Sequence, residues 1–237
     1  MEIVNFSNLT LTIGDAEDVR NKIIEKIKSG EKTFVVTLNA SILLRTLKDA
    51  YYRKVVNHAH FIIPDGSGIV WALKRNRNLN TDRITGIDTM LYLCEEAKKN
   101  GWKVYLLGSQ PSIVEEAARR LIKNGVNVIG YHHGYFKDEN IPVEEIEKLK
   151  PDLLFVGMGV PKQEEWIYKN YNLPFKFAMG VGGSFDVISG KKKRAPLIFQ
   201  NLRLEWFYRW LQSPLKKRNV PIEIFRYYFL VLRGKIK

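Results

Sequence analysis

Residues 61–68 read Phe-Ile-Ile-Pro-Asp-Gly-Ser-Gly, and the rest of the chain is organised around this stretch. Its three apolar residues predict a short buried strand that ends at Pro64, because proline has no N–H to continue a ladder. Asp65 then stands at the carboxyl end of the strand, where Gly66 and Gly68 permit a tight turn before a helix. An open α/β sheet binds its ligands at this kind of position. The alternative is that Asp65 only caps the helix.

The same alternation of strand and helix runs through most of the chain. Near-continuous apolar strands separated by amphipathic helices predict a parallel sheet that is covered on both faces. Predicted strands span 33–38, 61–63, 104–108, 126–131, 153–157 and 176–181, and predicted helices span 16–29, 41–49, 69–73, 87–100, 111–124, 143–149 and 161–170. A hairpin is expected over 2–6 and 9–13, and an exposed polar loop over 75–83.

Length and composition fit one large domain with an appendage. The chain has 237 residues, of which 45% are hydrophobic, and this is enough for a real core. Its one cysteine, Cys94, lies on the apolar face of a predicted helix and reads as a packed thiol. No signal peptide and no run of about 20 apolar residues is present. We therefore expect a cytoplasmic protein.

The positive charge is concentrated at the C-terminal end. The net charge is +13, and residues 191–237 carry 13 Lys and Arg against two acidic residues. We place a domain boundary here, with an α/β domain at 1–195 and a helical appendage at 196–237. Two helices are expected in the appendage, over 197–212 and 221–234. The fold class is thus a Rossmann-like, open and mostly parallel sheet with a basic α-helical C-terminal appendage. A basic segment of this kind indicates an anionic partner, either a membrane surface or a nucleic acid.

Glycines follow several predicted strands, in positions that suit phosphate binding. Residues 180–184 read Gly-Val-Gly-Gly-Ser and lead from a strand into a helix, where backbone N–H groups receive phosphate. A second glycine turn, at 157–163, carries Lys162. Two such turns on one sheet edge predict a diphosphate and hence a nucleotide. The residues assigned to it are Gly108, Gly157, Gly159, Lys162, Gly182, Gly183 and Ser184.

Other signatures of nucleotide and metal binding are absent from the sequence. Neither the dinucleotide Gly-x-Gly-x-x-Gly motif after the first strand nor a P-loop occurs, which argues against a dehydrogenase or a P-loop NTPase. No Asp-x-Asp pair is present to hold a metal beside a sugar diphosphate. The four histidines, His58, His60, His132 and His133, lack a convincing metal-ligand setting. We therefore expect neither a metal nor a cofactor.

A set of short motifs, in a fixed order along almost the whole chain, resembles the WecG/TagA/CpsF family of bacterial glycosyltransferases. Within that family the pattern is most similar to the enzymes of teichoic-acid linkage. The motifs are Thr37-x-Asn39-Ala40, Pro64-Asp65-Gly66-x-Gly68, Gly86-x-Asp88, Leu107-Gly108, Gly134-Tyr135-Phe136, Gly157-x-Gly159-x-Pro161-Lys162-Gln163-Glu164, Gly180-Val181-Gly182-Gly183-Ser184-Phe185-Asp186, Arg194-Ala195-Pro196 and Glu205-Trp206-x-x-Arg209.

The resemblance implies a reaction and its partners. A UDP-sugar would donate N-acetylmannosamine to undecaprenyl-diphosphate-linked N-acetylglucosamine, with inversion to a β-linkage and no required metal. N-acetylmannosamine uronic acid and glucose are donor alternatives that the sequence leaves open. Self-association is also left open.

The resemblance implies roles for individual residues. Asp65 would be the general base, and a partly desolvated carboxylate gains basicity. Substrate contacts would come from Thr37, Asn39, Gly66, Tyr135 and Arg209, and the nucleotide would also contact Gln163 and Asp186. After Arg209 the tail departs from the family pattern, so the sequence does not assign a diphosphate contact among Lys216, Lys217 and Arg218.

The sequence also predicts that the appendage binds a membrane surface. Ile222, Phe225, Phe229 and Leu232 fall on one side of a helix that also carries arginines, a pattern typical of anionic membrane surfaces. Packing on the body or in an oligomer interface would produce the same pattern. A nucleic-acid-binding protein is the competing class of function, and it would show steeply salt-dependent binding and need no Asp65. We expect no nucleic acid.

Overall fold

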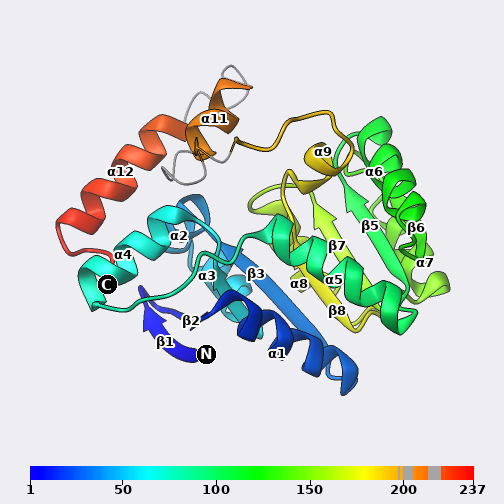
Figure 1. The fold of residues 1–237 in the computed structure, drawn as a ribbon, viewed down its shortest axis with the longest axis horizontal. Helices are drawn as coiled ribbons and strands as arrows, with labels where there is room; N and C mark the ends of the chain where they lie inside the picture. Colours follow the sequence, from blue (N-terminus) through cyan, green and yellow to red (C-terminus); the bar gives the residue numbers. More distant parts are fainter. Residues whose placement is uncertain (197, 200–204, 213–219) are drawn as a thin grey trace.

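A six-stranded sheet forms the centre of the computed structural model, which describes residues 1–196, 198–199, 205–212 and 220–237. The strand order is β4-β3-β8-β7-β5-β6, and each neighbouring pair is parallel (Figure 1). The strands are β3 (Thr33–Leu38), β4 (Phe61–Pro64), β5 (Val104–Gly108), β6 (Val128–His132), β7 (Leu153–Gly157) and β8 (Phe177–Gly180). The predicted Rossmann-like α/β fold is confirmed.

Alternate side chains along the strands enter two separate apolar clusters, one on each face of the sheet. Val36 and Leu38 of β3 belong to one cluster, while Val35 belongs to the other. The first face is covered by α2 (Ala40–Thr46), α3 (Ala50–Asn57), α4 (Ser67–Arg77), α7 (Asn140–Leu149) and α8 (Lys162–Lys169). The second is covered by α1 (Ala16–Lys28), α5 (Gly86–Asn100), α6 (Pro111–Lys123) and the short α9 (Ser184–Ile188). Burial on both faces explains why the strands are continuously apolar.

Most predicted elements are present, with two informative differences. The hairpin of β1 (Glu2–Phe6) and β2 (Leu9–Ile13) is antiparallel as expected. The sequence predicts no element over 50–57, yet α3 begins there after Asp49, whose carboxylate accepts a hydrogen bond from the N–H of Tyr52 (2.9 Å). The loop expected at 75–83 begins only at Asn78, because α4 continues to Arg77.

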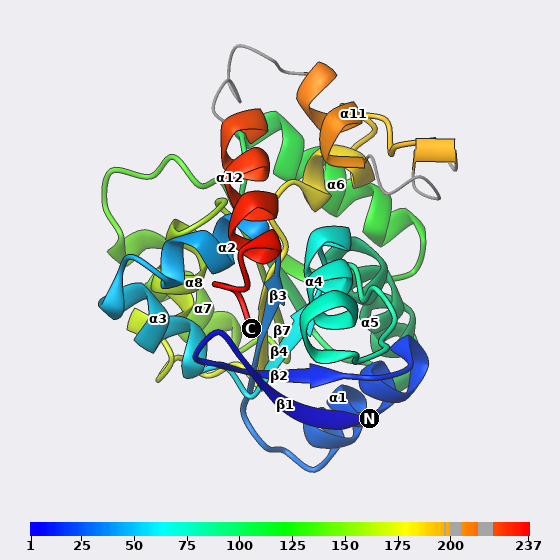
Figure 2. The ribbon, with the colours of Figure 1, turned by 90° about the vertical axis from the view of Figure 1, so that its left-hand side faces the viewer.

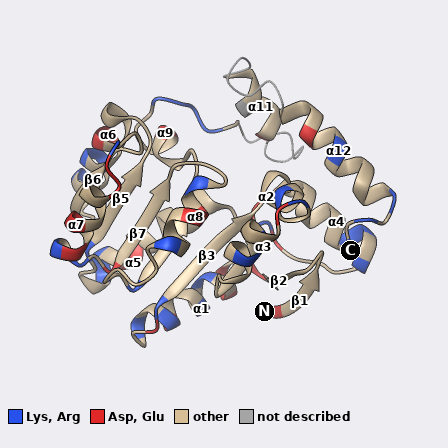
Figure 3. Ribbon diagram, turned by 180° about the vertical axis from the view of Figure 1, so that it is seen from behind, with Lys and Arg blue, Asp and Glu red and all other residues tan. Residues whose placement is uncertain are grey.

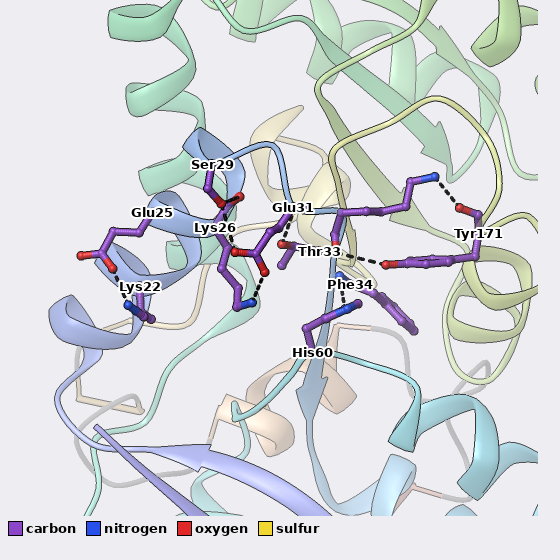
Figure 4. Close-up of polar contacts among 10 residues, drawn as sticks. Lys22, Glu25, Lys26, Ser29, Glu31, Thr33, Phe34, His60 and Tyr171 are labelled. Carbon is purple, nitrogen blue, oxygen red and sulfur yellow. Dashed lines mark hydrogen bonds and ion pairs between the residues drawn. The ribbon is translucent and has the colours of Figure 1, made fainter.

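The amino end of β3 is held by local polar contacts (Figure 4). The backbone N–H of Phe34 donates to His60 Nδ1 (3.2 Å), and Thr33 Oγ1 donates to the carbonyl of Glu31 (2.9 Å). Burial lowers the pKa of His60, which keeps this ring nitrogen available as an acceptor near neutral pH. These donors and acceptors are paired with one another within the protein, so we assign a structural role to the residues at this end of the strand.

The C-terminal helix α12 (Val220–Leu232) is docked on the body (Figure 2). Tyr227 and Val231 are fully buried in the cluster that also contains residues of α2 and α4. The phenol of Tyr227 donates to the carbonyl of Gly68 (2.9 Å), and a side chain at Gly68 would lie only 3.0 Å from the Tyr227 ring. After α12 the chain returns to the hairpin, where Lys237 N donates to Ser7 Oγ (3.1 Å).

The other appendage helix, α11 (Glu205–Leu211), falls within the helix expected over 197–212. Part of that expected helix, and Lys216, Lys217 and Arg218 beyond it, lie outside the described residues.

Replacing Tyr227 by alanine should lower the free energy of unfolding by about 3–5 kcal/mol, because a fully buried ring and its hydrogen bond are lost. Phe225 lies on the same helix but is 75% exposed, so Phe225→Ala should cost less than about 1 kcal/mol. Urea unfolding of both variants compares the two costs. Equal costs would contradict the docking of α12.

Candidate active site

Three glycines bring the turns after β5, β6 and β7 into contact at the carboxyl edge of the sheet. Gly108 and Gly157 are paired across β5 and β7, and a Cβ on Gly108 would lie 2.5 Å from the carbonyl carbon of Gly157. A Cβ on Gly134 would lie 3.1 Å from the Cα of Gly108. Gly108 also has a φ of +126°, which L side chains rarely adopt. Only glycine therefore permits this convergence.

The contact lies where the strand connections diverge. The chain leaves β5 outward to the edge strand β6, whereas it leaves β7 inward to β8. Open α/β sheets bind their ligands at such a point of divergence. The predicted positions Gly108 and Gly157 are thus brought together at the expected place.

Gln163, at the start of α8, joins the two glycine turns. Its side-chain oxygen accepts hydrogen bonds from the backbone N–H of Gly159 (3.1 Å) and of Gly182 (3.0 Å), and the residue is only 2% exposed. The sequence predicts that Gln163 contacts the nucleotide and that these glycine turns receive phosphate. In the structure both N–H groups and the amide oxygen are used within the protein. The contact of Gln163 with a nucleotide stays a prediction.

Glu164 is a buried carboxyl group for which the sequence motifs predict no role. It is 1% exposed, and it accepts hydrogen bonds from Gln163 Nε2 (2.7 Å) and from the phenol of Tyr52 (2.9 Å). Burial raises the pKa of Glu164 to about 7, against the opposing effect of the two hydrogen bonds. The sequence could not reveal this group, since its burial depends on α3 packing against α8.

The second half of the site lies at the ends of β3 and β4. Asp65 N and Gly66 N both donate to the carbonyl of Leu38 (3.0 and 3.1 Å), which folds this turn back over β3. Asn39 caps α2 through its side-chain oxygen, and a Cβ on Gly66 would lie 3.2 Å from the Cα of Asn39. The partly buried Asp65 is therefore close to Asn39. The N-cap position of α4 falls on Gly66 instead of Asp65.

Thr37 links the two halves of the site. It is 5% exposed, and its hydroxyl donates to the carbonyl of Gly180 at the end of β8 (3.3 Å). Its methyl group would lie 3.2 Å from a Cβ on Gly86. The predicted contact of Thr37 with substrate remains a prediction, and the structure adds this internal hydrogen bond.

The remaining predicted residues are spread along the same edge of the fold. Lys162 is exposed at the first position of α8, and Tyr135 is 69% exposed in the loop after β6. Ser184 is buried and its hydroxyl donates to the carbonyl of Val181 (2.7 Å). Gly183 is the N-cap of α9, and Asp186 forms an ion pair with Lys192 (3.2 Å). Arg209 lies in α11, but its side chain is outside the described part of the structure.

One ion pair tethers the appendage to the body, and a second holds the segment that leads into the appendage. Arg83 pairs with Glu205 at the start of α11 (2.8 Å), and both side chains are mostly buried. Arg194 pairs with Asp88 at the start of α5 (2.7 Å). Burial alone would raise the pKa of Asp88, but the hydrogen bonds from Arg194 and Thr85 outweigh it and hold the pKa below its usual value. The sequence does not single out Arg83 because its partner is distant along the chain.

Two further features concern where a metal ion or another ligand could bind. Among the described residues, no group of three or more His, Cys, Asp and Glu side chains is placed to hold a metal ion. A hollow of about 510 Å³ lies away from the carboxyl edge, lined by Trp71, Lys74, Asp82 and their neighbours. Its lining includes none of the residues predicted to bind substrate or nucleotide.

An open parallel sheet that gathers glycine turns and a carboxylate at its carboxyl edge has the ligand-binding arrangement of α/β proteins. The family profile described as "Glycosyl transferase WecG/TagA/CpsF family" matches residues 4–237. The chain belongs to this family and is a glycosyltransferase.

Named relatives agree with the family. Proteins of Staphylococcus aureus strains MRSA252 and NCTC 8325 are each 38% identical to this chain over 245 residues, which cover 99% of this chain and 92% of the relative. Both are named N-acetylglucosaminyldiphosphoundecaprenol N-acetyl-beta-D-mannosaminyltransferase. The resemblance seen in the sequence motifs is thereby confirmed.

Glu164→Gln should flatten the dependence of stability on pH between about 4.5 and 7. The pKa of Glu164 rises from 4.5 to about 7 on folding, so the folded chain binds more protons in this window. Proton binding by Glu164 therefore contributes fully to the free energy of unfolding below pH 4.5. This contribution, about 3 kcal/mol in total, is lost as the pH rises through 7. Urea unfolding at pH 5 and pH 8 measures the loss in both proteins. An equal loss would contradict titration of Glu164 in the folded state.

Proposed function

We propose that the protein transfers N-acetylmannosamine from UDP-N-acetylmannosamine to undecaprenyl-diphosphate-linked N-acetylglucosamine, with inversion to a β-linkage and without a metal. The observation that carries this proposal is the similarity, over 99% of the chain, to relatives that are named as N-acetyl-beta-D-mannosaminyltransferases acting on N-acetylglucosaminyldiphosphoundecaprenol. The site supports it, because a carboxylate and converging glycine turns lie along one sheet edge.

Asp65 is the general base of the proposed reaction. A hydroxyl oxygen of the acceptor sugar attacks the anomeric carbon of the donor and passes its proton to the Asp65 carboxylate. The bond from the anomeric carbon to the diphosphate oxygen breaks, and UDP leaves with the electron pair. One displacement of this kind inverts the anomeric centre. Asn39 and Gly66 border Asp65 and help to position the reacting sugars.

The diphosphate of the leaving UDP lies over the glycine turns. Gly108 and Gly157 are buried where the turns pack together, whereas Gly159 and Gly182 have open space where a Cβ would lie, and this space lets a diphosphate approach closely. Lys162 supplies positive charge from the start of α8, and Arg209 supplies it from α11. The contacts of Asp186 and Tyr135 with the donor stay part of this proposal.

Asp65→Asn should lower kcat by about 10²–10⁴ with little change in the KM for the UDP-sugar, because the amide cannot accept the proton. The assay is acceptor-dependent release of UDP from UDP-N-acetylmannosamine in the presence of EDTA. Asp18→Asn, on an exposed turn of α1, is the matched control and should behave like the wild type.

Each outcome of this assay corrects a different part of the proposal. Loss of all turnover in EDTA, with recovery on adding a divalent cation, would contradict metal independence. Turnover only with UDP-N-acetylmannosamine uronic acid or UDP-glucose would change the donor alone. Full activity of the Asp65 variant would remove Asp65 as the base.

The lipid-linked acceptor would bring the enzyme to the inner face of the cell membrane as a peripheral protein. None of the helices that the structure describes is long and apolar enough to cross a bilayer. The outer side of α12 presents Ile222, Phe225, Phe229 and Leu232, which are between 42% and 75% exposed. Lys and Arg residues lie on α12 and along the segment after α9 (Figure 3). Apolar side chains with cations suit the headgroup region of anionic lipid.

Phe225→Ser combined with Phe229→Ser should weaken binding to phosphatidylglycerol-containing vesicles by at least about tenfold, since burial of one phenylalanine contributes about 1.5–3 kcal/mol. Tyr51 and Ile122 are similarly exposed on other helices, so Tyr51→Ser with Ile122→Ser is the control and should bind like the wild type. Sedimentation with vesicles measures both. Equal binding by the three proteins would place the membrane contact elsewhere.

A further inference from the structure

The side chain of Gln163 can hold the two glycine turns in only one of its two orientations. Two N–H donors, from Gly159 and Gly182, face its oxygen, and one carboxylate oxygen of Glu164 faces its nitrogen. Turning the amide by 180° would direct its NH₂ group at the two N–H donors and its oxygen at the carboxyl oxygen. Each of these contacts would be repulsive. The acceptor supplied by Glu164 therefore selects the orientation that joins the turns.

Glu164 is itself fixed on two sides. The phenol of Tyr52, from α3, donates to Glu164 Oε2 (2.9 Å), and Tyr52 is fully buried. A Cβ on Gly180 would lie 2.5 Å from Gln163 Nε2 and 3.0 Å from Glu164 Oε1, so both side chains pack directly against the end of β8. Burial raises the pKa of Tyr52, which remains a donor over the working range of pH.

We propose that Glu164, held by Tyr52, is a positioning residue for the donor site: it orients the Gln163 amide, and the amide fixes the turns at Gly159 and Gly182. This inference rests on the proposed function, since the turns are taken to receive the diphosphate of the UDP-sugar. Glu164 does not touch the substrate. Its contribution is to keep the turns in the geometry that binds the nucleotide, and loss of that geometry weakens binding even when the fold survives.

The requirement at position 164 is an acceptor oxygen and not a charge. In either protonation state Glu164 keeps an unprotonated oxygen toward Gln163 Nε2, because the proton can reside on the oxygen that faces the Tyr52 hydroxyl. Glutamine retains such an acceptor in the same volume. Methionine has nearly the same length and lacks the acceptor. Comparing Glu164→Gln with Glu164→Met thus separates two roles of the side chain: orienting the Gln163 amide through an acceptor, and filling the volume.

Calorimetric titration with UDP, run on the full chain, tests the proposal. Glu164→Met should weaken UDP binding by roughly ten- to a hundredfold, whereas Glu164→Gln should change the Kd by less than about threefold. Circular dichroism confirms that both variants are folded. A folded Glu164→Met protein that binds UDP like the wild type would overturn the proposal. Equal weakening in both variants would also overturn it, because the acceptor would then not be the requirement.

Amide hydrogen exchange gives a readout that does not depend on the ligand. The N–H groups of Gly159 and Gly182 should exchange at least about tenfold faster in Glu164→Met than in Glu164→Gln or the wild type, since their acceptor would be free to turn away. Unchanged exchange in Glu164→Met would overturn the proposal. If wild-type protein did not bind UDP, the proposed donor would be wrong, and the exchange rates would still decide whether Glu164 positions the turns.

Two phenol-to-phenylalanine variants provide a matched pair if Glu164→Met does not fold. Tyr52 and Tyr105 are both fully buried, and each phenol donates to a glutamate, Glu164 and Glu145 respectively. Tyr52→Phe should speed exchange at Gly159 and Gly182 by at least about threefold, and Tyr105→Phe should leave it unchanged. Equal exchange in these two variants would contradict the role of Tyr52.

Discussion

The backbones of Gly108 and Gly157 touch at the carboxyl edge of the sheet, and the rest of the site depends on this contact. It requires the absence of a side chain at Gly108, since a Cβ there would lie within 2.5–2.8 Å of the Gly157 backbone. Glycine turns are costly to order, because glycine loses more conformational freedom on folding than any other residue. Gln163 offsets part of this cost by bonding the turns at Gly159 and Gly182 through one side-chain oxygen.

The same edge couples the glycine turns to the carboxylate and to the appendage. Thr37 connects the end of β3 to Gly180 of β8, and the turn containing Asp65 folds over the carbonyl of Leu38. Tyr227 of α12 packs on Gly68, three residues beyond Asp65. The helix that carries the exposed apolar stripe therefore rests on the start of α4, just after the proposed base. Contact of α12 with lipid would thus act close to the reacting groups.

Local patterns were sufficient to predict the strands and most helices, because the strands are apolar on both faces and the helices have clear periodicity. They also led to Asp65, Gly108 and Gly157, since the carboxyl end of a parallel strand can be read from a single segment. The helix α3 was missed, because its stability comes from burying Tyr52 against α8 and not from helix propensity.

The internal hydrogen bonds of Gln163 and Glu164 could not be predicted from the sequence for a related reason. Their partners lie on β8, α3 and a distant turn, and the strand order that places β8 at the centre of the sheet is not encoded in any local pattern. A glutamine beside a glycine turn reads as a ligand contact in the sequence. In the fold its amide is used between two turns.

A crystal structure of the protein with UDP would test the central claim most directly, namely that the donor binds at the carboxyl edge of the sheet. We predict that the diphosphate lies over the glycine turns at Gly159 and Gly182, with the site of the departing sugar facing Asp65. Binding of UDP elsewhere, for example in the hollow beside Trp71, would contradict the assignment of the active site.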